Sequence, residues 1–230
     1  GYWAWDPVEN AAFIPWLLAT AFLHSVMIQE KRGMLKIWNM VLIVAAFGTT
    51  IFGTYLTRSG IISSVHAFAR NEGFNISFLL FLATSTIVAL YFIVTRIELL
   101  DSEHRLDSLL SRESAFLYNN VVLVGAAFVV LFGTMFPLMS QWLRGVEVSV
   151  GPMWFNKVLW PMWAFLLVLT GIGPLIAWRR ADTANIGRNF VWPVAFAVIV
   201  MIGMPLLGFW NGYAIGFIGL SGFVTATVVQ

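Results

Sequence analysis

Long unbroken runs of apolar residues are the feature that most constrains how this chain can fold. Hydrophobic residues occupy 60% of its 230 positions and charged residues only 10%. In water such runs would leave large exposed apolar surfaces, whereas a lipid bilayer requires them. The sequence therefore predicts an all-α, polytopic integral membrane protein.

Seven apolar segments follow one another along the chain, and each complete one has about the 20 residues that a spanning helix needs. We expect six complete helices and the start of a seventh, at roughly residues 10–29, 37–57, 76–95, 116–139, 158–178, 190–210 and from 213 onward. Because the chain opens in an aromatic stretch and stops in an apolar run, we expect it to be a piece of a longer protein.

The basic residues of the connections predict which side faces the cytoplasm. Alternating helices place nine on one side (Lys31, Arg32, Lys36, Arg96, Arg105, Arg112, Arg179, Arg180 and Arg188) and four on the other (Arg58, Arg70, Arg144 and Lys157). By the positive-inside rule the richer side is cytoplasmic. Residues 1–6, 58–75 and 140–157 would then lie outside, and residues 96–113 are expected to form an amphipathic helix on the cytoplasmic surface.

Other features exclude some classes of protein. The net charge of +2 is too small to indicate a nucleic-acid partner, so the basic residues are better explained by topology. The absence of cysteine excludes disulfides and thiolate metal sites within this chain.

The segment Asp6-Pro7-Val8-Glu9 has the pattern of a helix start. Asp is a preferred N-cap, Pro suits the first helical position, and Glu three residues after the cap completes a capping box. We expect this segment to begin the first membrane helix at the outer interface. A helix N-terminus there could also attract an anion.

Three aromatic residues, Tyr2, Trp3 and Trp5, stand directly before this cap. Tryptophan is common at membrane interfaces, so an ordinary aromatic belt is the simpler explanation. A shelf against which a flat ligand stacks is the alternative, and the residues alone favour the belt.

The three histidines differ in their surroundings. His24 lies about 27 Å along the first helix from Asp6, and an ionisable group inside a membrane helix indicates a functional site, although a structural hydrogen bond explains it equally well. His66 would share one face of a short outer helix with Ser59, Ser63 and Arg70, which is also what an ordinary polar face looks like. His104 is expected to be solvated.

The segment GYWAWDPVENAAFIPWLLATAFLHS resembles the tryptophan-rich, haem-handling signature of the CcmF family of cytochrome c-type biogenesis proteins. The resemblance continues through RSGIISSVHAFA, SRESAFLYNN, FGTMFPLMS, VSVGPMWFNKV and GIGPLIAWRR, in the family's order, and weakens after about residue 190. It implies a haem-handling membrane domain over residues 1–190, with the signature at 1–10, and further helices of the same domain over 191–230.

The resemblance also implies roles for particular residues. Trp3, Trp5 and Asp6 match the end of the tryptophan signature, and His24 matches a membrane histidine that ligates the iron of a resident haem b. His66 matches an external histidine that ligates the haem to be transferred, which makes it the expected catalytic residue. The partner histidine of each lies outside this chain.

The implied activity is that of a cytochrome c haem lyase, a holocytochrome c synthase component that joins haem to a Cys-x-x-Cys-His apocytochrome c. The implied partners are membrane lipid, the haem chaperone CcmE, the apocytochrome and the CcmH-type thiol reductase component. The implied place is the bacterial inner membrane, with the haem site on the periplasmic face. Two alternatives stay open: a CcmC-like haem transporter or delivery protein without ligation, and a general transporter whose tryptophans form only a belt.

Overall fold

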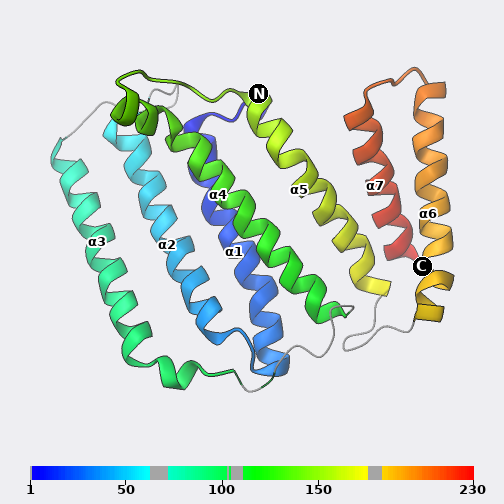
Figure 1. Ribbon diagram of the computed structural model, residues 1–230, viewed down its shortest axis with the longest axis horizontal. Helices are drawn as coiled ribbons and strands as arrows, with labels where there is room; N and C mark the ends of the chain where they lie inside the picture. Colours follow the sequence, from blue (N-terminus) through cyan, green and yellow to red (C-terminus); the bar gives the residue numbers. More distant parts are fainter. Residues whose placement is uncertain (1, 63–71, 103, 105–110, 176–182) are drawn as a thin grey trace. The chain divides into compact units, whose positions relative to one another are not determined.

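The computed structural model describes residues 2–62, 72–102, 104, 111–175 and 183–230. Over these residues the chain is helical without strands, which confirms the predicted fold class. In chain order the helices are α1 (Pro7–Arg32), α2 (Lys36–Ser59), α3 (Glu72–Thr95), the 3₁₀ helix η1 (Ile97–Leu100), α4 (Arg112–Arg144), α5 (Pro152–Ile172), the 3₁₀ helix η2 (Gly173–Leu175), α6 (Thr183–Leu206) and α7 (Gly212–Val229) (Figure 1).

Seven of these helices, α1 to α7, are long and apolar enough to cross a membrane. The predicted seventh segment, expected only as the start of a helix, runs for 18 residues over Gly212–Val229. The chain is therefore a multi-pass membrane protein, as the apolar runs predicted.

Two details of the predicted elements are wrong. The fifth helix was expected at 158–178, but α5 spans Pro152–Ile172, because Pro152 fits the first helical position and Gly173-Pro174 cannot continue the helix. The amphipathic helix expected over 96–113 is reduced to the single turn η1, after which Asp101, Ser102 and His104 are not helical. The rest of that stretch before Ser111 lies outside the described residues.

Packing divides the chain into two compact units. The first consists of residues 1–105 and 123–159, and the second of residues 106–122 and 160–230. In the first unit, α2 packs against both α1 and α3. α1 and α2 approach closely at Gly53, where an added Cβ would lie 2.9 Å from the Ala11 carbonyl oxygen. Small residues at such crossings let helix backbones meet in membranes.

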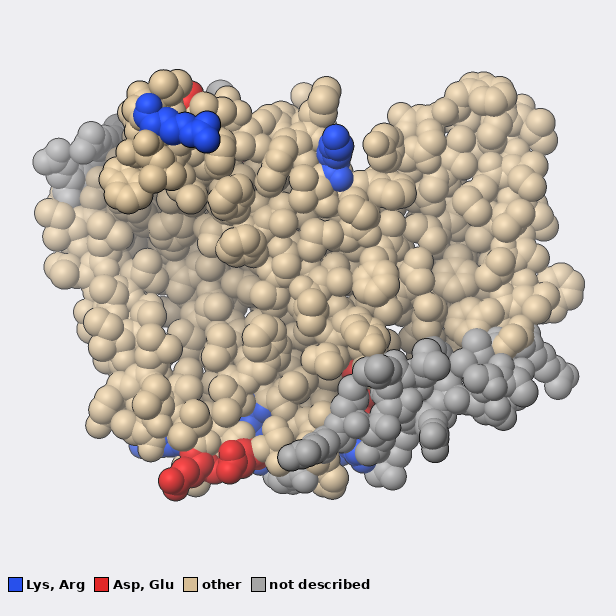
Figure 2. Space-filling view, in the orientation of Figure 1, with Lys and Arg blue, Asp and Glu red and all other residues tan. Residues whose placement is uncertain are grey.

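A buried cluster lies at the outer end of the first unit. Ala11, Leu56 and Ile62 form its centre, with Met135 and Leu138 of α4 among the side chains packed against it. Charged atoms in Figure 2 lie near the ends of this unit's helices, and the band between them is uncharged. This is the distribution that a bilayer imposes on spanning helices.

The second unit is built around α6 and α7, which pack against each other. An added Cβ at Gly219 of α7 would lie 2.3 Å from Met201 of α6. Gly171 similarly leaves room for the ring of Phe223. Here too glycines admit large side chains between neighbouring helices.

Candidate functional site

The capping box expected at the start of α1 is present. Asp6 is the N-cap, and its side chain accepts hydrogen bonds from the Val8 N–H, at 2.9 Å, and from the Glu9 N–H. The Glu9 Oε2 atom accepts from the backbone N–H groups of Asp6, at 3.1 Å, and Ala4, at 3.0 Å. Two carboxylates therefore satisfy the donors of this helix end.

This arrangement argues against an anion at the N-terminus of α1. Pro7 has no N–H, and those of Val8 and Glu9 donate to Asp6. A propionate would meet donors that are already bonded and the charges of Asp6 and Glu9. The helix end therefore fixes the chain rather than receiving an anionic group.

Trp5 has an unusual backbone conformation. Its φ is +59°, and it is one of two non-glycine residues with positive φ among the described residues. The left-handed region costs an L-residue about 1–2 kcal/mol, so other interactions must hold Trp5 there.

Asn10 of α1 supplies the first of these interactions. Its side chain is 1% exposed, and its Nδ2 donates to the Trp5 carbonyl at 3.2 Å and to the Thr134 hydroxyl of α4 at 3.0 Å. The Thr134 hydroxyl donates in turn to the Val130 carbonyl. One buried amide thus ties the backbone of Trp5 to α4.

The indole of Trp5 is held by α5. Its Nε1–H donates to Asn156 Oδ1 at 2.8 Å, and its ring stacks on Phe155 with centroids 5.0 Å apart and planes 10° apart. Phe155 itself is buried, and Gly133 of α4 makes room for it, since a Cβ there would lie 2.6 Å from the ring. We call Asn10, Phe155, Asn156 and their contacts with Trp5 the Trp5 clamp.

The other aromatic rings form a ladder beside the clamp. Trp3 meets Trp5 edge-on at 5.9 Å and Phe13 at 5.4 Å, and Phe13 stacks on Trp16 at 5.5 Å. Because Trp3 and Trp5 are perpendicular, the segment is not the flat shelf considered from the sequence.

Exposure separates these rings by role. Tyr2 and Trp3 are 86% and 47% exposed, whereas Trp5 is half-buried with one face covered by Phe155. Trp142, near the end of α4, is 84% exposed, as an interfacial belt residue would be. Trp5 therefore belongs to the protein's packing rather than to a belt, while Tyr2 and Trp3 offer ring surface to a ligand.

The sequence-predicted histidines are not brought to this segment by the described residues. His24 is half-buried in α1, 18 residues and therefore about 27 Å from Asp6 along the axis. His66 lies outside the described residues. His104 is exposed, and its Nδ1 lies 3.0 Å from the Arg32 carbonyl oxygen. The described residues contain no group of three side chains that could hold a metal ion.

Sequence reasoning missed Asn10, Phe13, Phe155 and Asn156. Phe155 and Asn156 stand in the segment VSVGPMWFNKV, which contributed to the resemblance, but nothing in their spacing indicates contact with a residue 151 positions away. Asn10 offered a weak signal, because an amide inside an apolar helix requires a hydrogen-bond partner.

Comparison with known proteins places this segment in a family. The model of the family described as cytochrome C assembly protein matches residues 1–66, which contain the tryptophan-rich segment and α1. Over 219 residues, 94% of the chain, it is 39% identical to "Cytochrome c-type biogenesis protein CcmF" of Pseudomonas fluorescens, of which it covers 31%. Over 208 residues, 90% of the chain, it is 38% identical to the protein of that name from Escherichia coli, of which it covers 32%.

A solved structure agrees. "Cytochrome c Heme Lyase CcmF" matches the whole chain with a TM-score of 0.76 and 36% identity, over 33% of its own length. The chain is thus a membrane protein of the cytochrome c assembly class. Within that class it belongs to the CcmF family, and it spans about a third of the length of the relatives it matches.

Proposed function

We propose that this chain takes part in cytochrome c maturation, binding haem at its tryptophan-rich segment during covalent attachment to an apocytochrome c. The observation that carries the proposal is the Trp5 clamp. A bulky residue held at φ +59° by a buried amide, a stacked ring and an indole hydrogen bond is strain retained at one place. Such strain is typical of functional sites. The names of the relatives, biogenesis protein and haem lyase, supply the reaction.

The clamp would set the position of the ligand-binding rings. With Trp5 fixed by α4 and α5, the edge-on contact between Trp5 and Trp3 orients the exposed ring of Trp3. Tyr2 and Trp3 would then contact the porphyrin of the substrate haem through apolar aromatic surface. His66, from the connection between α2 and α3, would ligate its iron, as imidazole commonly does.

Ligation adds each apocytochrome thiol across a vinyl group of haem. A sulfur–carbon bond forms, the vinyl double bond is lost, and the thiol proton passes to the vinyl carbon. The step needs reduced thiols and no net oxidant, which fits a CcmH-type thiol reductase component as a partner. CcmE would supply the haem, and the site would face the periplasm from the bacterial inner membrane.

His24 is the proposed ligand of a resident haem b. A haem iron accepts one or two protein ligands, and His24, half-buried in a membrane span, is suited to supply one of them. Bound there, the haem would supply an electron to the substrate haem. In this proposal residues 1–190 belong to the haem-handling domain, and 191–230 add further helices to it.

The test uses the full-length protein co-expressed with CcmE and a Cys-x-x-Cys-His apocytochrome. The His66→Ala variant should lose covalent haem on the cytochrome while CcmE stays loaded. Unloaded CcmE would instead support a delivery protein without ligation. His104→Ala is the matched control, because His104 is exposed at the other end of the helices, and it should leave haem attachment unchanged.

The resident haem is tested by absorbance. Purified full-length protein should show a b-type Soret band that is lost in His24→Ala and kept in His104→Ala. A Soret band that survives His24→Ala would contradict the role of His24. No band in any variant would favour a general transporter.

A further inference from the structure

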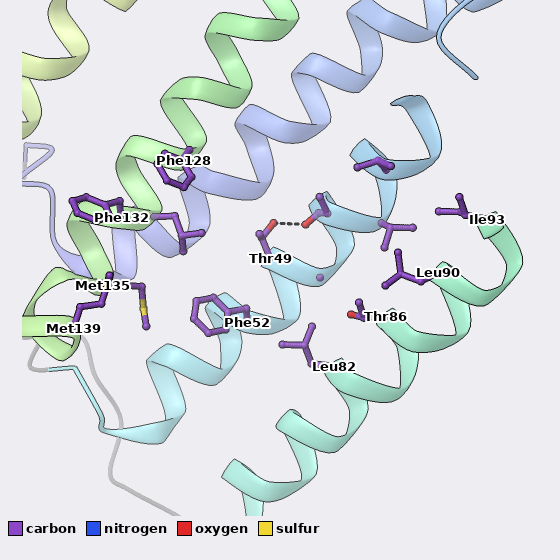
Figure 3. A pocket seen from close by; sticks show the side chains of 15 residues that line it. Thr49, Phe52, Leu82, Thr86, Leu90, Ile93, Phe128, Phe132, Met135 and Met139 are labelled. Carbon is purple, nitrogen blue, oxygen red and sulfur yellow. Dashed lines mark hydrogen bonds between the residues drawn. The ribbon is translucent and has the colours of Figure 1, made fainter. Parts of the chain in front are cut away.

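A long apolar groove runs between α2, α3 and α4 in the first unit. Its volume is about 890 Å³. Figure 3 shows the lining side chains converging from the three helices, with Thr49 and Phe52 of α2 opposite Phe132 and Met135 of α4. Leu82 and Leu90 of α3 line the remaining side. The site proposed for haem lies elsewhere, at the start of α1.

The lining is uniformly apolar in character. The hydroxyl of Thr49 donates within its own helix, to the Ala45 carbonyl at 2.8 Å, and so offers its methyl group to the groove. Gly48 leaves the groove open, since the nearest atom to an added Cβ is Leu82 Cδ1 at 3.7 Å. A polar ligand would find no matching partner among these lining residues.

The length of the groove matches one leaflet of a bilayer. The lining residues span Val41 to Phe52 on α2, Leu82 to Ile93 on α3 and Phe128 to Met139 on α4. Each stretch rises about 16 Å, and half of a hydrocarbon core is about 15 Å thick. One acyl chain therefore fits the groove from end to end.

Charged groups stand at one end of the groove. Ile93 is followed by Arg96, whose guanidinium carbon lies 5.0 Å from the centre of the Phe92 ring, so that its positive charge is held at the membrane surface. Glu98 and Asp101 follow it, both exposed. A phosphate beside Arg96 with an ammonium beside the two carboxylates is the charge pattern of phosphatidylethanolamine.

We propose that this groove binds one phosphatidylethanolamine, with an acyl chain between α2, α3 and α4 and the headgroup phosphate at Arg96. α3 has no buried residue in its most apolar stretch, so the surrounding bilayer reaches it directly. The lipid would complete the packing between α2 and α4 and bridge α3 to the unit.

The test is native mass spectrometry of the full-length protein released from nanodiscs of phosphatidylethanolamine and phosphatidylglycerol. The wild type should retain one phosphatidylethanolamine. Gly48→Phe, which fills the groove, should reduce retention at least fivefold. Gly203→Phe is the matched control, since Gly203 lies on α6 with no atom within 4 Å of an added Cβ. Arg96→Gln should reduce retention, and Arg144→Gln, at the far end of α4, should not.

Loss of lipid from both glycine variants alike, retention of phosphatidylglycerol in equal amount, or a lipid-free wild type would overturn the proposal. A second measurement does not depend on the folding of a variant. Wild-type protein is labelled with phosphatidylethanolamine carrying a diazirine in its acyl chain, and the labelled peptides should include residues 82–93 and 128–139. Labels confined to other segments would refute the site, as would a protein segment found cross-linked in the groove.

Discussion

The Asn10→Asp substitution gives the sharpest test of the Trp5 clamp. The two side chains are nearly isosteric, but a carboxylate cannot donate to the Trp5 carbonyl or to the Thr134 hydroxyl, whose own proton goes to Val130. The substitution therefore removes two buried hydrogen bonds without creating a cavity.

The magnitude follows from those two bonds. Each contributes about 0.5–1.5 kcal/mol net, so the free energy of opening the segment should fall by about 2 kcal/mol. The left-handed conformation of Trp5 already favours opening by about 1–2 kcal/mol. Since every 1.4 kcal/mol is a factor of ten, the open state should become about 30-fold more populated.

Hydrogen exchange measures this population directly. The reporting amides are those of Ala4 and Asp6, which donate to Glu9, and those of Val8 and Glu9, which donate to Asp6. Their exchange should accelerate about 30-fold in Asn10→Asp, because opening of the segment exposes them.

A matched asparagine provides the control. Asn39 is also fully buried, and its Nδ2 donates to Gln29 Oε1 at 2.6 Å. Asn39→Asp should accelerate exchange near residues 29–39 and leave residues 4–9 unchanged. Unchanged exchange of residues 4–9 in Asn10→Asp, or equal acceleration in both variants, would refute the clamp.

Three further outcomes follow from the packing. Asn156→Leu removes the acceptor of the Trp5 indole and, at about 0.5–1.5 kcal/mol, should accelerate exchange of the same four amides about two- to twelvefold, and no change would show that the hydrogen bond contributes nothing. Gly133→Ala places a Cβ 2.6 Å from the Phe155 ring and should lower stability by about 1–3 kcal/mol, seen as a lower thermal midpoint, while Gly203→Ala, with open space, should not. Gly53→Ala should lower the midpoint by pushing α2 from the Ala11 carbonyl, whereas Gly48→Ala, 3.7 Å from its nearest neighbour, should be tolerated, and equal midpoints would contradict the close crossing.

The spanning helices and the capping box were predictable because both are local. Hydrophobic run length fixes a spanning helix, and Asp6 with Glu9 satisfies donors within the same turn. The error in α5 came from placing its start by hydropathy alone, although Gly151-Pro152 marks it. The amphipathic helix over 96–113 was wrong at Asp101 and Ser102 because an apolar stripe can be drawn through a short segment that has no partner to stabilise it.

The Trp5 clamp was not predictable, because its parts meet only through tertiary packing. Neither the positive φ of Trp5 nor its contacts with Phe155 and Asn156 follow from residue spacing. Sequence reasoning treated Trp3 and Trp5 as one flat surface, whereas the structure gives them perpendicular planes. The predicted role of His66 stays a prediction.

The contacts of Trp5 have a consequence for how the protein is made. Its partners Thr134, through Asn10, and Asn156 are 124 and 151 residues downstream of the residues they bind. At a synthesis rate of about 5–20 residues per second, α5 emerges about 8–30 s after the segment at the start of α1. Until then nothing holds Trp5 in its left-handed conformation. The segment that reaches the membrane surface first therefore acquires its final shape late, and a chain that stopped before α5 would carry the tryptophans without the clamp.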